Sequence, residues 1–284
     1  MVFSWRESGK NEVRCFSELF LLYLLKQVRM TRGKRMLRYA VRSHPGCIRE
    51  TNEDRFYIPP ENGPLIFAVA DGMGGHVAGE VASSIAIETL ETNISVLTEK
   101  LSKCDLINIR DYLQQSILEA NENILDMQLQ KPELKGMGTT FTVAAFFNKN
   151  ELLTGHVGDS QAHLFNKSGH LQITEDHSVV MELLKNGEIK HEEIYTHPQR
   201  NFLTRALGTT TSLKIDFYRN DIIPGDYILL CTDGLTSMLR PREIQEIILH
   251  SEDLEAAANE LINKANAQGG LDNITFVLIH YFER

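Results

Sequence analysis

The sequence is poor in cysteine and has no long hydrophobic run. Only four of its 284 residues are cysteines (Cys15, Cys47, Cys104 and Cys231), and none belongs to a C-x-x-C pair. Their wide and irregular spacing argues against a disulfide framework and indicates a reducing compartment. No apolar stretch reaches the ~18–20 residues of a membrane-spanning helix. We therefore expect a cytoplasmic protein.

Positive charge is scarce outside the N-terminal segment. The chain has 29 Lys and Arg against 38 Asp and Glu, which gives a formal net charge of −9. Residues 1–38 hold nine of the basic residues and only three Glu. The remainder is acidic and is expected to repel nucleic acid at ordinary ionic strength. Where several of its carboxylates converge, it can bind divalent cations.

Residues 1–36 form an extension with a pattern of its own. Apolar residues recur at helical spacing from Phe16 to Val28, and basic residues follow them. One interpretation is an amphipathic, basic helix that lies on a membrane surface or on a partner protein. The alternative, which we favour, is a loosely structured extension, or translated upstream sequence with the true start at Met30 or Met36.

From residue 37 to 284 the pattern is that of one folded domain. The predicted strands lie at 37–43, 64–70, 139–147, 152–157, 161–165, 171–174, 226–231 and 274–280. The predicted helices lie at 77–92, 105–130, 176–186, 241–250 and 252–266. Helices in pairs between runs of closely spaced strands favour two packed antiparallel sheets with helices outside each.

Two aspartates share one local design. Asp71 and Asp233 each follow a predicted buried strand and precede a glycine, and Asp272 stands where the final strand begins. Carboxylates at strand ends can converge on one end of a sheet sandwich, and converging like charges need a cation or their pKa values rise. A single Asp-Gly pair is usually an ordinary turn. The prediction therefore depends on the combination.

A cluster of oxygen ligands has a defined chemistry. Such ligands select the hard ions Mg²⁺ or Mn²⁺ over zinc. Two ions ~3.5–4 Å apart can deprotonate a bridging water and clamp a phosphoryl group for in-line attack. Glu53 and Asp54 can complete the metal shell, and Arg49 can bind a phosphate dianion through its planar guanidinium. The ordinary alternative for these three residues is a solvated run of charges.

The segment DGMGGHVAGE at 71–80 is a glycine-rich turn. It lets the backbone approach an ion, with the Gly72 carbonyl as a candidate ligand. It is no P-loop, because G-x-x-x-x-G-K-[ST] occurs nowhere in the chain. His76 in this turn could protonate a leaving alkoxide, although one histidine of ten is more often structural. Asp159, in a Gly-Asp-Ser turn, offers a carboxylate for a weaker third ion.

The spacing from Cys104 to Arg110 matches the C-x₅-R loop of cysteine phosphatases. Such a loop wraps its backbone N–H groups around phosphate. Asp105 would repel that anion, and the residues between Cys104 and Arg110 include no glycine. We interpret the spacing as chance.

Eight segments occur in the order seen in the metal-dependent protein phosphatases of the 2C class, and the bacterial branch is most similar. The segments are RETNED at 49, ADGMGGHVAGE at 70, GTT at 138, HVGDS at 156, TEDHS at 174, LTRALG at 203, CTDGL at 231 and GLDNIT at 270. The resemblance runs from about residue 38 to 281. Eight ordered motifs are far more specific than a lone glycine pattern.

The resemblance implies a fold and an activity. The implied fold is α+β, a four-layer α-β-β-α sandwich with a metal cleft at one end. The implied enzyme is a protein serine/threonine phosphatase with two Mn²⁺ or Mg²⁺ ions and a third in bacterial relatives. Its partners would be phosphorylated proteins, the substrates of Ser/Thr kinases. We expect a monomer, and only the extension could contact a membrane.

The resemblance also implies roles for individual residues. Asp71 would bridge both ions, and the Gly72 carbonyl would bind one of them. Asp233 and Asp272 would bind the other ion. Asp159, together with Asp233, would form the third-metal site.

Further roles follow from the first motif and the flap. Glu53 and Asp54 match an acidic pair of which one member lies near the metal, and Arg49 matches the phosphate-binding arginine. Residues 178–200 match a flap beside the cleft that is thought to influence substrate choice.

The sequence also departs from the family pattern. Gln161 replaces an arginine that often follows the Gly-Asp-Ser turn, so a surface or flap contact is expected to be missing. His76 is offset by three residues from the histidine used as an acid in animal members. The alternative function is a catalytically inactive phosphoprotein-binding module of the same fold. Such a module should lose Asp71, Asp233 or Asp272, and all three are present.

Overall fold

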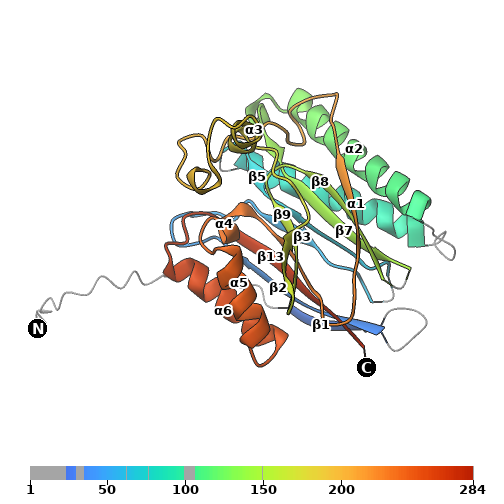
Figure 1. The fold of residues 1–284 in the computed structure, drawn as a ribbon. Helices are drawn as coiled ribbons and strands as arrows, with labels where there is room; N and C mark the ends of the chain where they lie inside the picture. The colour runs from blue at the N-terminus through green and yellow to red at the C-terminus, as the bar shows by residue number, and fades with distance from the viewer. Residues whose placement is uncertain are drawn as a thin grey trace, which may run out of the picture.

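Two antiparallel β-sheets lie face to face at the centre of the molecule, and a pair of helices covers the outer face of each (Figure 1). The computed structural model describes residues 24–29, 35–61, 63–75, 77–98, 106–148 and 150–283. The arrangement confirms the predicted α+β fold, a four-layer α-β-β-α sandwich.

The first sheet has six strands in the order β1-β2-β13-β12-β9-β10. Their bounds are Leu24–Arg29 (β1), Arg35–His44 (β2), Ile274–Glu283 (β13), Tyr227–Cys231 (β12), Gln161–Asn166 (β9) and Gly169–Gln172 (β10). All its neighbouring strands are antiparallel.

The second sheet has five strands in the order β11-β8-β7-β4-β3. Their bounds are Asp216–Asp221 (β11), Glu151–Val157 (β8), Phe141–Phe147 (β7), Ile66–Ala70 (β4) and Arg55–Tyr57 (β3). A short ribbon pairs Gly72–Met73 (β5) with Gly138–Thr139 (β6). The ribbon continues directly from β4 and β7 toward the end of the sandwich where the acidic motifs lie.

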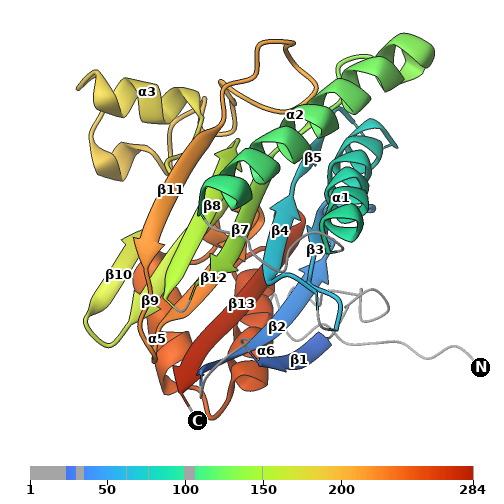
Figure 2. The same ribbon diagram turned by 90° about the vertical axis from the view of Figure 1, so that its right-hand side faces the viewer.

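The helices segregate by sheet (Figure 2). Val77–Thr98 (α1) and Leu106–Gln130 (α2) pack on the five-stranded sheet, whereas Pro241–His250 (α5) and Leu254–Ala267 (α6) pack on the six-stranded one. Two short helices, Val179–Lys185 (α3) and Asp233–Thr236 (α4), lie outside these pairs. Single 3₁₀ turns lie at Pro132–Leu134 and His191–Glu193.

Packing follows the residue sizes on each face. Ala78, Ala82, Ala86 and Leu90 form one buried stripe of α1, and such small side chains allow close approach to the sheet. Strand β4 (IFAVA) is buried on both faces, between α1 and the other sheet, which explains its continuous apolar run. Between the sheets, the Tyr39 and Phe67 rings meet edge to face at a centroid distance of 5.1 Å.

The structure corrects the helical spacing predicted within the N-terminal extension. Over Leu24–Arg29 the chain is strand β1, which pairs antiparallel with β2 from Leu24 opposite Val41 to Arg29 opposite Met36. The unpaired backbone groups of an edge strand favour such pairing over a short isolated helix. Residues 1–23 and 30–34 lie outside the described residues, so the start of the catalytic domain stays a prediction.

Several other short elements were not predicted, among them β3, β11 and α4. Strand β11 mixes polar and half-buried residues without alternation, and β3 and α4 are too short to carry a period. Across the described ranges, no helix combines the length and apolarity needed to cross a bilayer.

Candidate metal centre

Asp233 and Asp272 are brought together by strand pairing. Strands β12 and β13 are antiparallel, with Cys231 opposite Phe276. The end of β12, which leads to Asp233, therefore lies beside the start of β13, which follows Asp272. A Cβ atom on Gly234 would overlap the backbone oxygen of Asn273, so glycine permits the two turns to touch.

Asp71 comes from the other sheet, at the end of β4. Its amide donates to Thr140 Oγ1 at 2.9 Å, and its carbonyl accepts from the Thr140 amide at 2.9 Å. The Thr139 hydroxyl donates to the same carbonyl at 2.8 Å. Thr140 Oγ1 and Ser160 Oγ lie 2.7 Å apart. The GTT motif thus fixes the backbone of Asp71 and joins it to the turn that carries Asp159.

The carboxylates are close enough to perturb one another. Burial, followed by the charges of Asp54, Asp233, Asp159 and Asp272, holds the pKa of Asp71 well above its ordinary value. Burial and the charge of Asp272 raise the pKa of Asp233 to about 6, against a hydrogen bond with Asp71 that lowers it. The structure therefore brings Asp71, Asp233 and Asp272 within electrostatic reach of one another. Mutual repulsion of this kind marks candidate cation sites.

Asp54 is buried beneath these residues. The Thr232 hydroxyl donates to its Oδ2 at 2.9 Å, whereas its Oδ1 has no hydrogen-bond partner within the described part of the chain. Burial raises the pKa of Asp54 to about 7, with the hydrogen bonds of Thr232 and Thr275 acting against it. A buried carboxylate oxygen without a donor is costly unless a cation or water compensates it.

Glu53 lies against the glycine-rich turn. A Cβ atom on Gly79 would overlap Glu53 Oε2 and would lie 2.8 Å from the Gly72 carbonyl oxygen. A Cβ atom on Gly72 would overlap the Gly79 carbonyl. Both glycines are therefore needed for the turn to pack against Glu53. They leave the Gly72 carbonyl and the Glu53 carboxylate on the same side of the turn.

Arg49 stands at the rim of the acidic cluster. Its Nη2 donates to Asp272 Oδ2 at 2.9 Å, and 54% of its side chain is exposed. The guanidinium is thus next to the carboxylates and still accessible from solvent. Both conditions are required of a residue that binds an incoming phosphoryl group.

Asn273 holds the cluster together, and the sequence analysis assigned it no role. Its side-chain amide donates to the carbonyls of Pro45 at 3.0 Å and Thr51 at 2.8 Å. Its side-chain oxygen accepts from the Glu53 amide at 2.8 Å. One asparagine thereby fixes the first acidic motif beside Asp272. The GLDNIT motif contains it, but only its tertiary contacts reveal what it does.

A buried histidine fixes the turn that carries Asp159. His177 Nδ1 accepts from the Gly158 amide at 3.0 Å, and the His177 amide donates to the Gly158 carbonyl at 2.7 Å. Because Nδ1 accepts, Nε2 carries the proton and donates to Asp216 Oδ2 at 3.0 Å. Arg205 donates to the same Asp216 oxygen at 3.0 Å. Burial lowers the pKa of His177, in keeping with a neutral ring.

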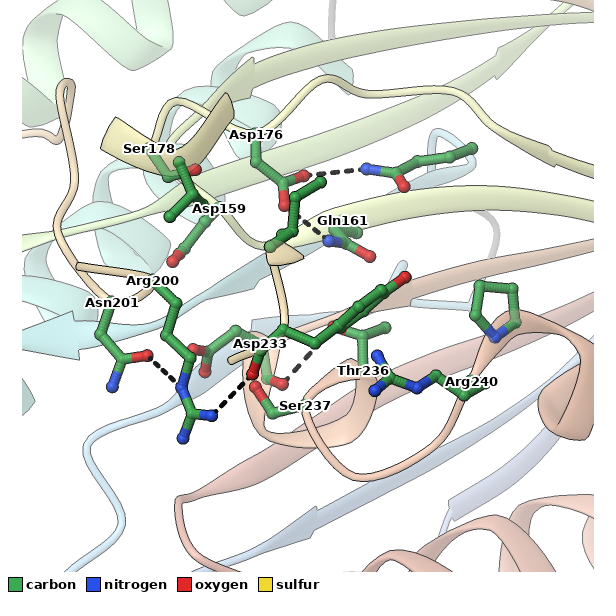
Figure 3. Close-up of a pocket in the computed structure, with 15 residues that line it drawn as sticks. Asp159, Gln161, Asp176, Ser178, Arg200, Asn201, Asp233, Thr236, Ser237 and Arg240 are labelled. Atoms are coloured by element: carbon green, nitrogen blue, oxygen red, sulfur yellow. Dashed lines mark hydrogen bonds between the residues drawn. The ribbon is translucent and has the colours of Figure 1, made fainter. Parts of the chain in front are cut away.

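A pocket of about 130 Å³ opens beside the cluster. Its lining combines Asp159 and Asp233 with Arg200 and Arg240, as Figure 3 shows. Arg200 belongs to the segment after α3, at the end of the predicted flap. The structure therefore places the flap segment and the acidic cluster around one cavity.

The Gln161 departure has a visible consequence in this pocket. Gln161 and Gln172 donate their side-chain amides to the two oxygens of Asp176, each at 2.8 Å. Gln161 therefore contacts Asp176 without bringing a positive charge into the pocket. Burial raises the pKa of Asp176 to about 7, against the two amide hydrogen bonds.

The donor set fits hard divalent cations. All the candidate side chains offer carboxylate oxygen, and Asp54 Oδ1 lacks a partner in the described residues. Within those same ranges, no three His, Cys, Asp or Glu side chains form a ready-made ligand cage. The carboxylates pair instead with Arg49 and with one another.

Two sequence candidates cannot be placed in this site. His76 and Cys104 lie outside the described residues. Arg110, the other half of the C-x₅-R spacing, belongs to α2, where its guanidinium carbon lies 5.2 Å from the centroid of the Phe217 ring. A helical arginine that packs on an aromatic ring does not belong to a phosphate-binding loop. Cys47 and Cys231, the two cysteines among the described residues, form no disulfide.

Known proteins resemble this chain over most of its length. A family profile described as protein phosphatase 2C matches residues 49–274. The serine/threonine phosphatase stp of Listeria monocytogenes serotype 4b is 40% identical over 240 residues, 84% of this chain and 93% of that protein.

Solved structures agree with the sequence comparison. Serine/threonine phosphatase Stp1 from Staphylococcus aureus has a TM-score of 0.81 at 32% identity, and the match covers 89% of this chain and 98% of that one. The catalytic domain of the serine/threonine protein phosphatase PstP, solved in complex with two manganese ions, has a TM-score of 0.76 at 34% identity. That match covers 88% of this chain and 100% of the PstP chain.

Proposed function

The chain belongs to the protein phosphatase 2C family, and from this premise we propose that its acidic cluster is the metal centre of the enzyme. The protein is a metal-dependent protein serine/threonine phosphatase. Its relatives named as serine/threonine phosphatases align along almost their entire length. What we propose is the role of each residue, the number and kind of ions, and the identity of the substrates.

In our proposal four groups hold two divalent ions. The Asp71 carboxylate would bind both ions, the Gly72 carbonyl would bind one of them, and Asp233 and Asp272 would bind the other. When bound, such a pair of ions supplies an activated water and stabilises the charge of the phosphoryl oxygens. Burial and neighbouring carboxylates raise the pKa values of both Asp71 and Asp233, which supports this assignment because a bound cation would relieve that repulsion.

The first motif supplies the second layer of the proposed site. Glu53 lies beside the Gly72 carbonyl and completes the shell of one ion. Asp54 plays a supporting role next to the ions. Its buried Oδ1 has no hydrogen-bond donor in the described ranges and is available to a cation or to a water bound to one. Arg49 binds the phosphate dianion, for which it exchanges its contact with Asp272. His76 remains the proposed general acid.

The proposed ions are two Mn²⁺, as in the PstP structure, or two Mg²⁺. A third ion is proposed at Asp159 with Asp233, because both line the same pocket. Burial and the charge of Asp233 raise the pKa of Asp159, which supports a cation between them.

The proposed substrates are phosphoserine and phosphothreonine residues of proteins modified by Ser/Thr kinases. We propose that the enzyme acts as a cytoplasmic monomer. The names of the related phosphatases support the substrate class and leave the individual substrate proteins open.

The convergence of Asp71, Asp233 and Asp272 is the observation that carries the proposal. It is tested by hydrolysis of a phosphothreonine peptide with Mn²⁺, with excess EDTA, and in Asp233→Asn. We expect activity only with the metal, and a loss of about 10²–10³-fold in kcat for the variant, comparable to removing a transition-state charge stabiliser. Asp111→Asn, on the exposed face of α2, is the matched control and should keep wild-type turnover.

Two outcomes would contradict the assignment. Wild-type turnover in a folded Asp233→Asn protein would remove that residue from the centre. Activity that survives EDTA but is lost in Cys104→Ser would support the cysteine chemistry that the C-x₅-R spacing suggests.

A further inference from the structure

The pocket beside the metal centre extends to two arginines that have no role in the chemistry above. Arg200 is the last residue of the flap segment, and Arg240 immediately precedes α5. In Figure 3 the carboxylates of Asp159 and Asp176 lie on one side of the pocket, and the guanidinium groups of Arg200 and Arg240 lie on the other. One side of the pocket is therefore acidic, and on the other side the two guanidinium groups lie next to Asp233 of the metal centre.

One residue of the flap holds both arginines. Arg200 Nη1 donates to the backbone oxygen of Tyr195 at 2.9 Å. The guanidinium carbon of Arg240 lies 3.4 Å from the centroid of the Tyr195 ring. A cation over an aromatic face is held by the ring quadrupole, and its N–H groups at the edge stay available to a ligand. The carbonyl and the ring of Tyr195 thus fix the spacing of the two positive groups.

Neither arginine forms an ion pair with a carboxylate among the residues that the structure describes, although the charge of Arg200 is near enough to lower the pKa of Asp233. Other arginines do: Arg205 pairs with Asp216 at 3.0 Å, and Arg55 pairs with Glu80 at 2.7 Å. Arg200 has a further contact, with the Asn201 side-chain oxygen at 3.3 Å, but that group is uncharged. A planar guanidinium without an ion-pair partner in a pocket is suited to a carboxylate or phosphate ligand.

The acidic residues of the pocket are engaged by groups other than the two arginines. Asp159 and Asp233 belong to the proposed metal centre. Asp176 accepts one hydrogen bond on each carboxylate oxygen, from the amides of Gln161 and Gln172. An anion that enters the pocket therefore meets the two arginines as its favourable partners.

We propose that Arg200 and Arg240 form a subsite that binds an anionic side chain of the substrate protein, either a carboxylate or a second phosphate, close in sequence to the phosphoresidue. This inference rests on the proposed function, since it requires the phosphoresidue to enter at Asp233. An extended peptide advances ~3.3–3.6 Å per residue, so a pocket that begins at Asp233 is within reach of roughly the first three neighbours. The subsite makes the enzyme selective for acidic sequences around the phosphoresidue.

The test compares phosphothreonine peptides that differ at one position. Ala, Glu, Lys or a non-hydrolysable phosphonate residue is placed at each of the three positions on either side, and kcat/KM is measured with Mn²⁺. At the best position we expect the wild type to prefer Glu over Ala by about fivefold, the scale of a partly exposed ion pair. The preference should shrink as ionic strength rises. The phosphonate arm shows whether phosphate or carboxylate is the better ligand.

Variants assign the preference to the two arginines. The readout is the ratio of kcat/KM for the Glu and Ala peptides, in which a general loss of activity cancels. The ratio should fall to about one in Arg200→Gln/Arg240→Gln, and Arg240→Lys should restore part of it, because lysine keeps the charge without the fork. Arg242→Gln, an exposed position two residues along the chain and outside the pocket lining, should keep the wild-type ratio.

The outcomes separate this proposal from the one on which it rests. A wild type that hydrolyses every peptide without preference for an acidic neighbour overturns the subsite. So does a double variant that keeps the wild-type ratio. A wild type that hydrolyses neither the peptides nor an aryl phosphate with Mn²⁺ would instead refute the proposed metal centre.

Discussion

Hydrogen bonds of Asn273 and the lack of a side chain at Gly79 position the residues of the acidic cluster. Asn273 joins Pro45, Thr51 and Glu53 through one amide, and Gly79 leaves the space that the Glu53 carboxylate occupies. None of these contacts involves the groups expected to touch substrate. The proposed chemistry therefore depends on residues such as Asn273 and Gly79, which position the metal ligands without binding metal or substrate themselves.

Gly79→Ala tests this dependence. In most helices alanine would be favoured over glycine by about 1 kcal/mol. Here the added methyl group would overlap Glu53 Oε2, so the carboxylate must move away from the Gly72 carbonyl. We expect the Mn²⁺ concentration for half-maximal activity to rise by about tenfold, a typical effect of disturbing the support of a metal ligand. Titration of activity against Mn²⁺ measures it.

Ser84→Ala, one turn further along α1, is the control and should keep the wild-type Mn²⁺ requirement. An unchanged requirement in Gly79→Ala would show that the position of Glu53 is irrelevant to metal binding.

At the scale of elements, the strand ends decide where the acidic motifs meet. Antiparallel pairing of β12 and β13 aligns two of them, and the end of β4 supplies the third from the opposite sheet. The six-stranded sheet has β1 as one of its two edge strands. It covers the edge of β2.

Truncation tests whether β1 belongs to the domain. A chain of residues 23–284 keeps β1, and a chain of residues 35–284 exposes the edge of β2. We expect the first to unfold at the wild-type temperature and the second to unfold at a lower temperature and to self-associate, because an open edge strand pairs with other chains. Thermal denaturation and light scattering measure both.

Equal unfolding temperatures for the two truncated chains would place β1 outside the stable domain. Liposome flotation of the full chain against 35–284 tests the membrane interpretation of the extension in the same samples. Equal flotation would remove that interpretation.

At the scale of the whole molecule, the buried carboxylates at one end of the sandwich repel one another and destabilise the folded state when they ionise. Burial raises the pKa of Asp54 to about 7 and that of Asp233 to about 6. In an unfolded chain both groups titrate near ~4. Between these values the folded state binds more protons than the unfolded state, so the free energy of unfolding decreases as pH rises. Ionising the cluster without a cation therefore weakens the fold.

The expected consequence is a dependence of thermal stability on pH that metal reverses. With EDTA present, the melting temperature should be lower at pH 7.5 than at pH 5.5. With Mn²⁺ in excess, it should be higher at pH 7.5, because ionised carboxylates bind the metal and binding to the folded state stabilises it. Differential scanning calorimetry at the two pH values measures both. In EDTA, a melting temperature that rises from pH 5.5 to 7.5 would contradict a strained acidic cluster.

The sequence by itself determined the fold class, the two helix pairs and the identity of the acidic residues. Periodicity was sufficient for the long elements, because the stripe from Ala78 to Leu90 and the run of β4 each repeat over several residues. Asp71 and Asp233 stood out because each ends a buried strand before a glycine. Such signals are local, and local spacing along the chain is what a sequence records directly.

Only the tertiary structure decided the rest. Strand β1 takes its partner from β2, so its helical spacing did not set its conformation. Asn273 and His177 act through contacts with residues distant in the chain, and no pattern of neighbours predicts them. Tyr195 meets Arg240 only after the flap folds back over the pocket. Hydrogen bonds and charges depend on distance in space, and only the assembled sandwich sets those distances.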